Sequence, residues 1–402
     1  MINMSPEKIH NFLNRGVEKI LPSKEFVQKQ LEQGQQLRIY YGIDPTGPSL
    51  HIGHAIVIKK IAELQQMGHK VIFLIGDFTA RIGDPTDKSA TRKTLTNEEI
   101  TENLKNYKKQ ASKIISFEGE NPAEIVFNND WLGKMSFADV LELCSKATIQ
   151  QLLERDMFQN RIKEGKPVYV HEALYPLMQG YDSVALMIDG EIGGNDQLFN
   201  MLMGRELLKE HGKEKFVMTV KLLADANGKK MGKSEGNMIT LDDSADDMFG
   251  KIMSWTDGMI IGGFELCTDI PTEQILEIGL SIQNGDNPMQ FKKQLAREII
   301  TLYHSADQAI DAQSNWEQTF SEGGIPENIP EIQGESNQLL SELLVEHNFI
   351  GSKAEFRRLT DEGGIKIISD DLTEEKITDF QYKISETIIV KIGKKKFVKV
   401  NI

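Results

Sequence analysis

The sequence predicts an α/β fold built on a parallel sheet, followed by an all-α region and a small α+β module. Three observations support this class. Buried-strand patterns at 37–43 and 71–77 flank a helical pattern at 50–66, which is the order of a right-handed crossover unit in a parallel sheet. Helical patterns resume after Asp243 and continue to about Phe320. Residues 337–402 then mix two short helical patterns with strand-like runs.

The first crossover unit predicts where a ligand binds. The strand at 37–43 ends at Asp44-Pro45-Thr46-Gly47-Pro48, whose residues strongly favour a turn. The helix that follows has apolar residues at helical spacing, and Gly68 is suited to end it. The second strand runs to Asp77. Because ligands bind parallel sheets at the carboxyl ends of the strands, we expect the Asp44 turn and Asp77 to lie at a ligand-binding edge.

The rest of the chain divides into further segments. Residues 96–165 are rich in helix formers and predict helices that cover or insert into the sheet. A strand-like run at 217–223 leads into a polar, glycine-bearing loop. We expect a catalytic domain at 1–225 with its insertion at about 96–165, a loop and connection at 226–242, a helical domain at 243–322, a linker at 323–336 and a final module at 337–402.

Composition limits the class of protein. The 402 residues are 40% hydrophobic and 26% charged, which is typical of a globular chain. The two cysteines, Cys144 and Cys267, form no CxxC pair, which argues against a zinc site or a disulfide framework. The N-terminus lacks the order of a signal peptide, and no apolar run approaches membrane-spanning length. We expect a cytoplasmic protein without a protein-ligated metal.

The charge is unevenly distributed. The formal net charge is −14, which by itself disfavours a nucleic-acid partner, yet residues 351–402 hold 11 basic and 9 acidic residues. A lysine cluster in this segment comprises Lys391, Lys394, Lys395, Lys396 and Lys399. The cluster fits a solvated chain end as well as it fits a phosphate-binding surface.

A histidine pair begins the first crossover helix. His51-Ile52-Gly53-His54 occupies its first turn, where unsatisfied backbone N–H groups and the helix dipole favour a phosphate. The two imidazoles add directional donors, and Gly53 allows a ligand to approach the backbone closely. Surface histidine pairs are common, so the position of this pair is what makes it informative.

A second basic motif lies in the loop after the strand at 217–223. Lys230-Met231-Gly232-Lys233-Ser234 contains too little glycine for a Walker loop. Two lysines three residues apart on a loop can close over a polyphosphate and neutralise charge that develops at phosphorus. Taken alone, the motif is more typical of a solvated lysine loop than of a phosphate site.

Together the two motifs resemble the signatures of class I aminoacyl-tRNA synthetases, His-Ile-Gly-His and Lys-Met-Ser-Lys-Ser, with Gly232 as the one departure. The resemblance to tyrosyl-tRNA synthetases covers nearly the whole chain. It includes the runs Tyr40-Tyr41-Gly42-Ile43-Asp44-Pro45-Thr46, Gly83-Asp84-Pro85, Tyr175-Pro176-Leu177-Met178-Gln179-Gly180-Tyr181-Asp182-Ser183 and Gly193-Gly194-Asn195-Asp196-Gln197. The resemblance implies a Rossmann-like catalytic domain.

The resemblance also implies roles for individual residues. Catalysis would fall to two imidazoles and two amines, those of His51, His54, Lys230 and Lys233. ATP would contact Gly42, Asp44, Thr46, His51, Gly53, His54, Gly194, Asp196, Lys230, Lys233 and Ser234. Tyrosine would be held at its hydroxyl by Tyr40 and Asp182, at its ammonium by Asp84, Tyr175 and Gln179, and near its carboxylate by Gln197. Mg²⁺ would arrive with the nucleotide.

The C-terminal module resembles the S4-type RNA-binding fold. The resemblance rests on the helical run that begins at Ser352 and on the turn at Glu362-Gly363-Gly364. It implies contact of the module with an RNA backbone. The residues concerned would be Lys353, Arg357, Arg358, Lys394, Lys395 and Lys396. The family further implies tRNA as partner and a homodimer.

Three alternatives stay open at this point. A tryptophanyl-tRNA synthetase shares both signatures but has no need of the Tyr40 and Asp182 pair and lacks an S4-like tail. A small nucleotidylyltransferase can place a similar histidine motif on the same turn, although the length of this chain and its second lysine loop speak against one. A non-catalytic RNA-binding protein on a synthetase scaffold is disfavoured by the intact signatures.

Overall fold

A computed structural model describes residues 5–84, 96–224, 238–321, 329–347, 349–368, 374–393 and 396–402. The chain forms two compact units, Met1–Ala306 and Asp307–Ile402. Within the described ranges, no helix has the length and apolar character needed to span a membrane.

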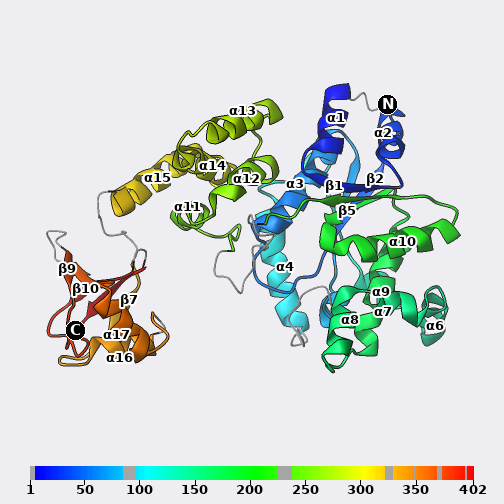
Figure 1. Ribbon diagram of the computed structural model, residues 1–402. Coiled ribbons are helices and arrows are strands. Elements are labelled where there is room, and N and C mark those ends of the chain that lie inside the picture. The colour runs from blue at the N-terminus through cyan, green and yellow to red at the C-terminus, as the bar shows by residue number, and fades with distance from the viewer. Residues whose placement is uncertain are drawn as a thin grey trace. The chain divides into compact units, whose positions relative to one another are not determined.

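The first unit is built on a mixed sheet that includes β1, β2 and β5 (Figure 1). The sheet has six strands in the order β1-β6-β5-β2-β3-β4. Only β1 is antiparallel to its neighbour. The mainly parallel sheet predicted from the crossover unit is therefore confirmed. The strands are β1 (Val17–Leu21), β2 (Arg38–Ile43), β3 (Lys70–Ile75), β4 (Glu124–Phe127), β5 (Gly190–Gly194) and β6 (Phe216–Val220).

The central strands are apolar on both faces because helices cover both faces. Successive side chains of a strand point to opposite sides of the sheet. Tyr40, Ile72 and Leu74 pack in one cluster with Leu208 of the α9–α10 pair, and all four side chains are buried. The helices around the sheet are α1 (Pro6–Asn14), α2 (Lys24–Glu32), α3 (Ile52–Gln66), α9 (Val170–Leu186) and α10 (Leu198–Glu210).

The strand order reverses next to β2. The chain passes from β2 through α3 to β3 and β4 on one side, whereas β5 and β6 lie on the other side of β2. In such sheets the loops after the two central strands diverge and leave a crevice at the carboxyl edge. Asp44 follows β2 and Asn195 follows β5, so both lie at this crevice.

The insertion at 96–165 contains the expected helices but also a strand, which corrects the purely helical prediction. β4 pairs in parallel with β3 and forms an edge of the sheet. Its four residues are too few for a periodic pattern to separate a strand from the neighbouring helices. The helices of this region are α4 (Asn97–Ala111), α5 (Asn129–Leu132), α6 (Phe137–Cys144), α7 (Ile149–Leu153) and α8 (Asp156–Lys163).

The helical pattern predicted after Asp243 is confirmed by five helices. These are α11 (Ala245–Met253), α12 (Ile260–Cys267), α13 (Thr272–Gln283), α14 (Pro288–Tyr303) and α15 (Ala306–Ser321). Buried apolar side chains of α11, α12 and α14 fill the space between them, for example Phe249, Phe264 and Leu295.

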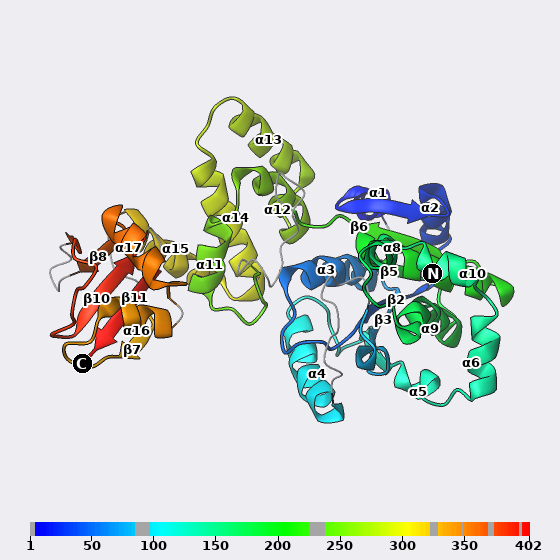
Figure 2. The same cartoon turned by 60° about the horizontal axis from the view of Figure 1, so that its bottom comes forward.

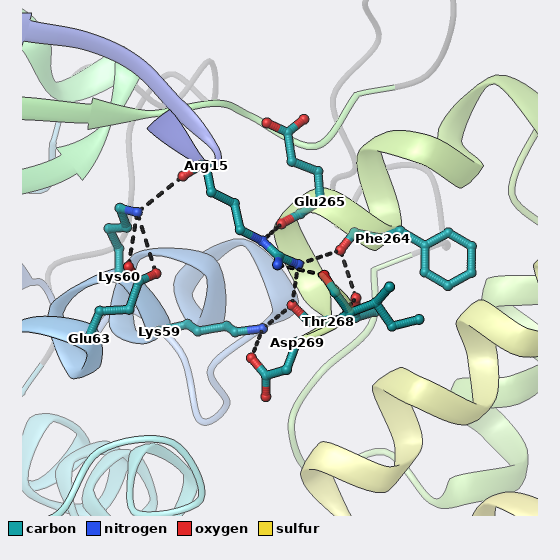
Figure 3. A network of polar contacts seen from close by, with 9 residues as sticks. Arg15, Lys59, Lys60, Glu63, Phe264, Glu265, Thr268 and Asp269 are labelled. Atoms are coloured by element: carbon teal, nitrogen blue, oxygen red, sulfur yellow. Dashed lines mark hydrogen bonds and ion pairs between the residues drawn. The ribbon is translucent and has the colours of Figure 1, made fainter. Parts of the chain in front are cut away.

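Arg15 joins this helical region to the sheet (Figure 3). Its guanidinium donates to four backbone carbonyls at the end of α12, with distances of 3.1, 3.0, 2.8 and 2.6 Å to Phe264, Glu265, Thr268 and Ile270. A cation there satisfies carbonyls that the helix end leaves without donors and complements the helix dipole. From α3, the Lys59 ammonium lies 2.7 Å from Asp269, and Lys60 donates to the Arg15 carbonyl at 3.1 Å.

The second unit carries a five-stranded sheet with the order β7-β11-β10-β8-β9. Figure 2 shows α16 and α17 against this sheet, and their apolar side chains form one core with it. The strand and helix patterns predicted for 337–402 are confirmed. The elements are β7 (Glu331–Gln333), α16 (Leu340–Glu346), α17 (Lys353–Asp361), β8 (Ile365–Ile368), β9 (Glu374–Lys376), β10 (Ile388–Ile392) and β11 (Lys396–Asn401).

Candidate active site

A cavity of about 290 Å³ opens at the crevice between the carboxyl ends of β2 and β5. Every described residue that the sequence predicted to bind ATP or tyrosine lines it. Lys230, Lys233 and Ser234 lie outside the described residues. The predicted residues along its wall are Tyr40, Gly42, Asp44, Thr46, His51, Gly53, His54, Asp84, Tyr175, Gln179, Asp182, Gly194, Asp196 and Gln197.

Asp182 of α9 forms the acidic part of the wall and is 2% exposed. Trp131 Nε1 donates to its Oδ1 at 2.7 Å, and Asn128 Nδ2 donates to its Oδ2 at 3.4 Å. Burial raises the pKa of Asp182 well above its ordinary value, and the nearby carboxylates of Glu191 and Asp44 act in the same direction, against the two hydrogen bonds.

Tyr40 of β2 is fully buried as a residue, and its hydroxyl lies 3.4 Å from Ser183 Oγ. Burial raises the pKa of the Tyr40 phenol well above its ordinary value, with smaller contributions from Glu191 and Asp182, so the phenol keeps its proton. The cavity thus has a phenol donor and a carboxylate acceptor in its wall.

A chain of amide hydrogen bonds links three residues of the cavity wall through the buried side chain of Asn200. Asn200 Nδ2 donates to the side-chain oxygens of Gln179 at 2.9 Å and of Gln197 at 3.0 Å. Gln197 in turn donates to Asp84 at 2.5 Å, and an Arg155 nitrogen lies 3.8 Å from the same carboxylate. The contacts fix the amide oxygens and nitrogens in one orientation each, which sets the polarity of this wall.

Asp44 is fixed from two sides after β2. Tyr175 donates to its Oδ2 at 2.8 Å, and Thr79 donates to its Oδ1 at 2.7 Å. A Cβ on Gly76 would lie 2.0 Å from Asp44 Oδ1 and 2.4 Å from Thr79 Oγ1. Glycine at position 76 therefore makes room for the Asp44–Thr79 contact, which the sequence pattern did not reveal.

The two predicted catalytic histidines cap α3. Gly53 N–H donates to His51 Nδ1 at 3.1 Å, and His51 N–H donates to His54 Nδ1 at 3.2 Å. The two rings stack with their centroids 3.7 Å apart. Because both Nδ1 atoms accept, a neutral ring carries its proton on Nε2. A Cβ on Gly53 would lie 3.0 Å from the His51 ring, so this glycine also makes room for the imidazole.

The described residues before the lysine motif line the cavity, and those after it contact the histidine pair and its helix. Leu222 and Leu223, just before the loop, line its wall. After the loop, Ile52 N–H donates to the Ile239 carbonyl at 3.0 Å, and His51 forms a β-bridge with Thr240. The residues on either side of 225–237 are therefore anchored beside the histidine pair.

The family model for "tRNA synthetases class I (W and Y)" matches residues 32–321, and most of the chain falls within this range. The chain belongs to this family. The family membership expected from the motifs is thereby confirmed, and so is the Rossmann-like character of the sheet.

Relatives of this synthetase extend over nearly its full length. A tyrosine–tRNA ligase of Carboxydothermus hydrogenoformans is 43% identical to this chain, and the match covers 96% of each protein. One of Thermotoga maritima is 41% identical, with 99% of this chain and 98% of that protein covered.

Solved structures agree with the fold of this synthetase. A truncated mitochondrial tyrosyl-tRNA synthetase of Coccidioides posadasii matches with a TM-score of 0.62 at 25% identity, over 76% of this chain and 91% of the other. A tyrosyl-tRNA synthetase of Archaeoglobus fulgidus complexed with L-tyrosine shares the fold, with a TM-score of 0.59 at 22% identity over 77% and 100% of the two chains.

The predicted RNA-binding residues of the synthetase are spread over the second unit. Lys353, Arg357, Arg358 and Lys396 are exposed, whereas Lys394 and Lys395 lie outside the described residues. Lys353 and Arg358 form ion pairs with Glu342 and Glu362. The Arg357 guanidinium lies 4.8 Å from the centre of the Phe380 ring.

Sequence reasoning gave no role to Thr79, which lines the cavity, or to the residues that support the cavity wall. Their types suit an ordinary core or turn. Ser183 ends the run at 175–183 and Glu191 shares β5 with the start of the run at 193–197, so closeness to a motif is the signal that could have pointed to these two. The full set of missed residues is Thr79, Asn128, Trp131, Ser183, Glu191, Asn200 and Lys215.

Proposed function

We propose that this synthetase is a tyrosine–tRNA ligase that activates tyrosine with ATP and then transfers it to the 3′-terminal adenosine of tRNA. One observation carries the proposal. A single cavity holds a histidine-capped helix N-terminus, suited to phosphate, together with a buried phenol and carboxylate, suited to a substrate hydroxyl. The relatives of nearly equal length bear the same name.

Tyrosine enters with its ring toward Tyr40 and Asp182. Its hydroxyl accepts from the Tyr40 phenol and donates to the Asp182 carboxylate, which rejects a phenyl ring because both partners would be left unpaired. Its ammonium lies near Asp84, Tyr175 and Gln179. The carboxylates of this wall make the inner part of the cavity favourable for a cation.

ATP lies at the outer part of the cavity, against Gly42, Thr46 and the start of α3, with Gly194 and Asp196 across the crevice. The proposal rests on the dipole at the start of α3 and on the two imidazoles that cap this helix, whose Nε2 atoms can donate. We assign phosphate contacts to Lys230, Lys233 and Ser234 as well, because the described residues before and after this motif lie at the cavity or beside the histidine pair. The nucleotide would carry Mg²⁺, which would supply further neutralisation of phosphate charge.

The first step is an in-line displacement. The tyrosine carboxylate attacks the α-phosphorus of ATP, a phosphorus–oxygen bond forms, and pyrophosphate leaves with the electrons of the broken bond. No covalent enzyme intermediate is required because the nucleophile is already an anion. Catalysis then comes from positioning and from donors that stabilise the leaving pyrophosphate, here His51 and His54 with the two lysines.

The second step uses a ribose hydroxyl of the tRNA's terminal adenosine. It attacks the activated carbonyl, and AMP leaves. For the tRNA we propose contacts with the helical domain at 243–322 and with the S4-like module at 337–402. The exposed basic residues Lys353, Arg357, Arg358 and Lys396, together with Lys394 and Lys395, supply phosphate contacts.

We expect the working form to be a homodimer. Large apolar side chains are exposed on α6, on α7 and at the start of α9. Phe137 is 77% exposed, Ile149 64% and Val170 75%. α6 and α7 both contact α9, and exposed apolar side chains on neighbouring helices are typical of a subunit interface. The cytoplasm is the proposed site of action, where tRNA is charged and where free Cys144 and Cys267 stay reduced.

An attachment assay tests the proposal. The full chain is incubated with ATP, total tRNA and each of the twenty amino acids in turn. We expect tyrosine alone to become attached. Attachment of tryptophan instead would favour the other branch of the family, and attachment of none would favour a non-catalytic RNA-binding protein.

A further inference from the structure

A buried ion pair lies directly behind the proposed tyrosine site. Lys215 precedes β6 and contacts Glu191 of β5, with side-chain exposures of 0% and 3%. Glu191 is the register partner of Tyr40 on the neighbouring strand. Moving two charges out of water costs several kcal/mol per ion, and apolar residues of similar size stabilise such positions equally well or better. The pair therefore calls for an explanation other than stability.

The pair is connected to both ends of the proposed substrate. Lys215 Nζ donates to Ser183 Oγ at 2.7 Å, and Ser183 Oγ lies 3.4 Å from the Tyr40 hydroxyl. On the other side, Gln179 Nε2 donates to Glu191 at 3.2 Å. Tyr40 faces the proposed hydroxyl end of the substrate and Gln179 the proposed ammonium end.

The neighbouring helix leaves room for this arrangement. A Cβ on Gly204 of α10 would lie 2.6 Å from Ser183 Oγ and 2.8 Å from Lys215 Nζ. Any larger residue would displace one of the two atoms. Glycine at position 204 therefore leaves the space that the Lys215–Ser183 contact occupies.

The direction of the hydrogen bonds follows from the donor and acceptor types. An ammonium can only donate, so Ser183 Oγ accepts from Lys215 and keeps its own proton for another acceptor. When Ser183 donates that proton to the Tyr40 oxygen, the Tyr40 proton is left for the cavity or for Glu191, whose carboxylate also raises the pKa of the Tyr40 phenol by accepting from it. The Lys215 ammonium, in contact with Glu191, competes for that carboxylate and so favours donation by Tyr40 to the cavity. A cation at the start of such a chain strengthens the donors along it.

We propose that Lys215, held by Glu191, directs a hydrogen-bond chain through Ser183 so that Tyr40 donates to the hydroxyl of the amino acid substrate. Lys215 and Ser183 are therefore positioning residues for the choice of tyrosine over phenylalanine. The inference rests on the proposed function and adds the origin of its specificity. It assigns no contact with ATP to either residue.

The test is amino-acid-dependent exchange of pyrophosphate into ATP by the full chain without tRNA, with tyrosine and with phenylalanine. In Ser183→Ala, we expect the ratio of kcat/KM for tyrosine to that for phenylalanine to fall about tenfold, the effect of one lost hydrogen bond. The KM for tyrosine rises, whereas the KM for ATP stays within about twofold of its original value.

A second variant removes the charges together. Lys215→Met/Glu191→Gln avoids an unpaired buried charge and keeps an acceptor for Gln179, so it tests the ammonium without leaving a carboxylate exposed to the core. We expect the same loss of discrimination. The matched control is Arg205→Met/Glu214→Gln, which removes an ion pair between α10 and the residue before Lys215 that lines no part of the cavity. The control should retain the tyrosine-to-phenylalanine ratio.

Folding of each variant is checked by circular dichroism and thermal unfolding. An unchanged ratio in folded Ser183→Ala overturns the inference while the proposed function stands. An equal change in the KM values for tyrosine and ATP also overturns it, since that result indicates a general structural effect. If Lys215→Met/Glu191→Gln does not fold, Ser183→Ala decides alone. A wild-type chain without tyrosine-dependent exchange overturns the proposed function and this inference together.

Discussion

Burial changes the ionisation of His69, which follows α3 and is fully buried. Its Nδ1 accepts the Leu37 N–H at 3.2 Å, a bond that requires an unprotonated nitrogen. Burial lowers the pKa of His69 from 6.5 to about 4, against a weak opposing effect of Asp189. The folded protein therefore keeps this imidazole neutral in mildly acidic solution.

The free energy of unfolding should respond to pH through His69. Between pH 6.5 and about 4 the unfolded chain binds a proton that the folded chain does not, so stability falls as the pH falls through this range. From pH 7 to pH 5 we expect a loss of about 2 kcal/mol from this residue. In His69→Gln, which keeps an acceptor, urea unfolding at the two pH values should show a correspondingly smaller loss. An equal loss in both proteins would contradict the assignment.

A second prediction concerns the buried carboxyl of Asp182. Asp182→Asn replaces the proposed acceptor of the substrate hydroxyl with an amide of the same shape. We expect kcat/KM for tyrosine in pyrophosphate exchange to fall roughly 10-fold, the effect of one lost hydrogen bond, and that for phenylalanine to change little. Asp130→Asn, at a nearby exposed carboxylate, is the control. Equal losses for both amino acids would count against a contact with the hydroxyl.

The residue scale also shows what the motifs could and could not predict. Tyr40, Asp84 and Asp182 were singled out through a family resemblance, and the fold brings them to one cavity. Ser183, Glu191 and Lys215 were given no role, although Ser183 ends the run at 175–183, because their residue types suit an ordinary core position. Their role depends on contacts between residues that are 24 to 32 positions apart in the sequence, and no local sequence pattern shows such contacts.

Arg15 holds several elements together, because its guanidinium donates hydrogen bonds to four backbone carbonyls at the end of α12. Arg15→Met removes the donors of four part-buried carbonyls and keeps most of the apolar stem. We expect the free energy of unfolding to fall by about 2–4 kcal/mol. Urea unfolding measures this change. Lys29→Met, at an exposed position of α2, should change it by less than about 0.5 kcal/mol. Similar values for both variants would contradict the role of Arg15.

Elements with a long periodic pattern were predictable, and short ones were not. The run at 50–66 and the strands at 37–43 and 71–77 contain enough apolar positions to define a period. β4 has four residues and β7 has three, and both owe their conformation to pairing with a longer strand. Tertiary pairing of this kind overrides local propensity.

The exposed apolar side chains of α6, α7 and α9 predict that two copies of the protein associate as a dimer. Val170→Glu places a charge on this surface, where it would be buried in an interface. We expect wild type to sediment as a dimer at micromolar concentration and Val170→Glu to shift toward the monomer. Leu280→Glu alters a side chain that is 59% exposed on α13 and should leave the dimer intact. A monomeric wild type would refute the prediction.

In the proposed reaction, the histidine pair and the tyrosine pocket act on the same bound tyrosine and ATP. Single-turnover formation of tyrosyl-adenylate, measured beside equilibrium tyrosine binding, tests this most directly in His54→Ala, with exposed His10→Ala as control. We predict that His54→Ala lowers the rate about 100-fold or more while the tyrosine Kd stays within about twofold. An unchanged rate in His54→Ala would contradict the account.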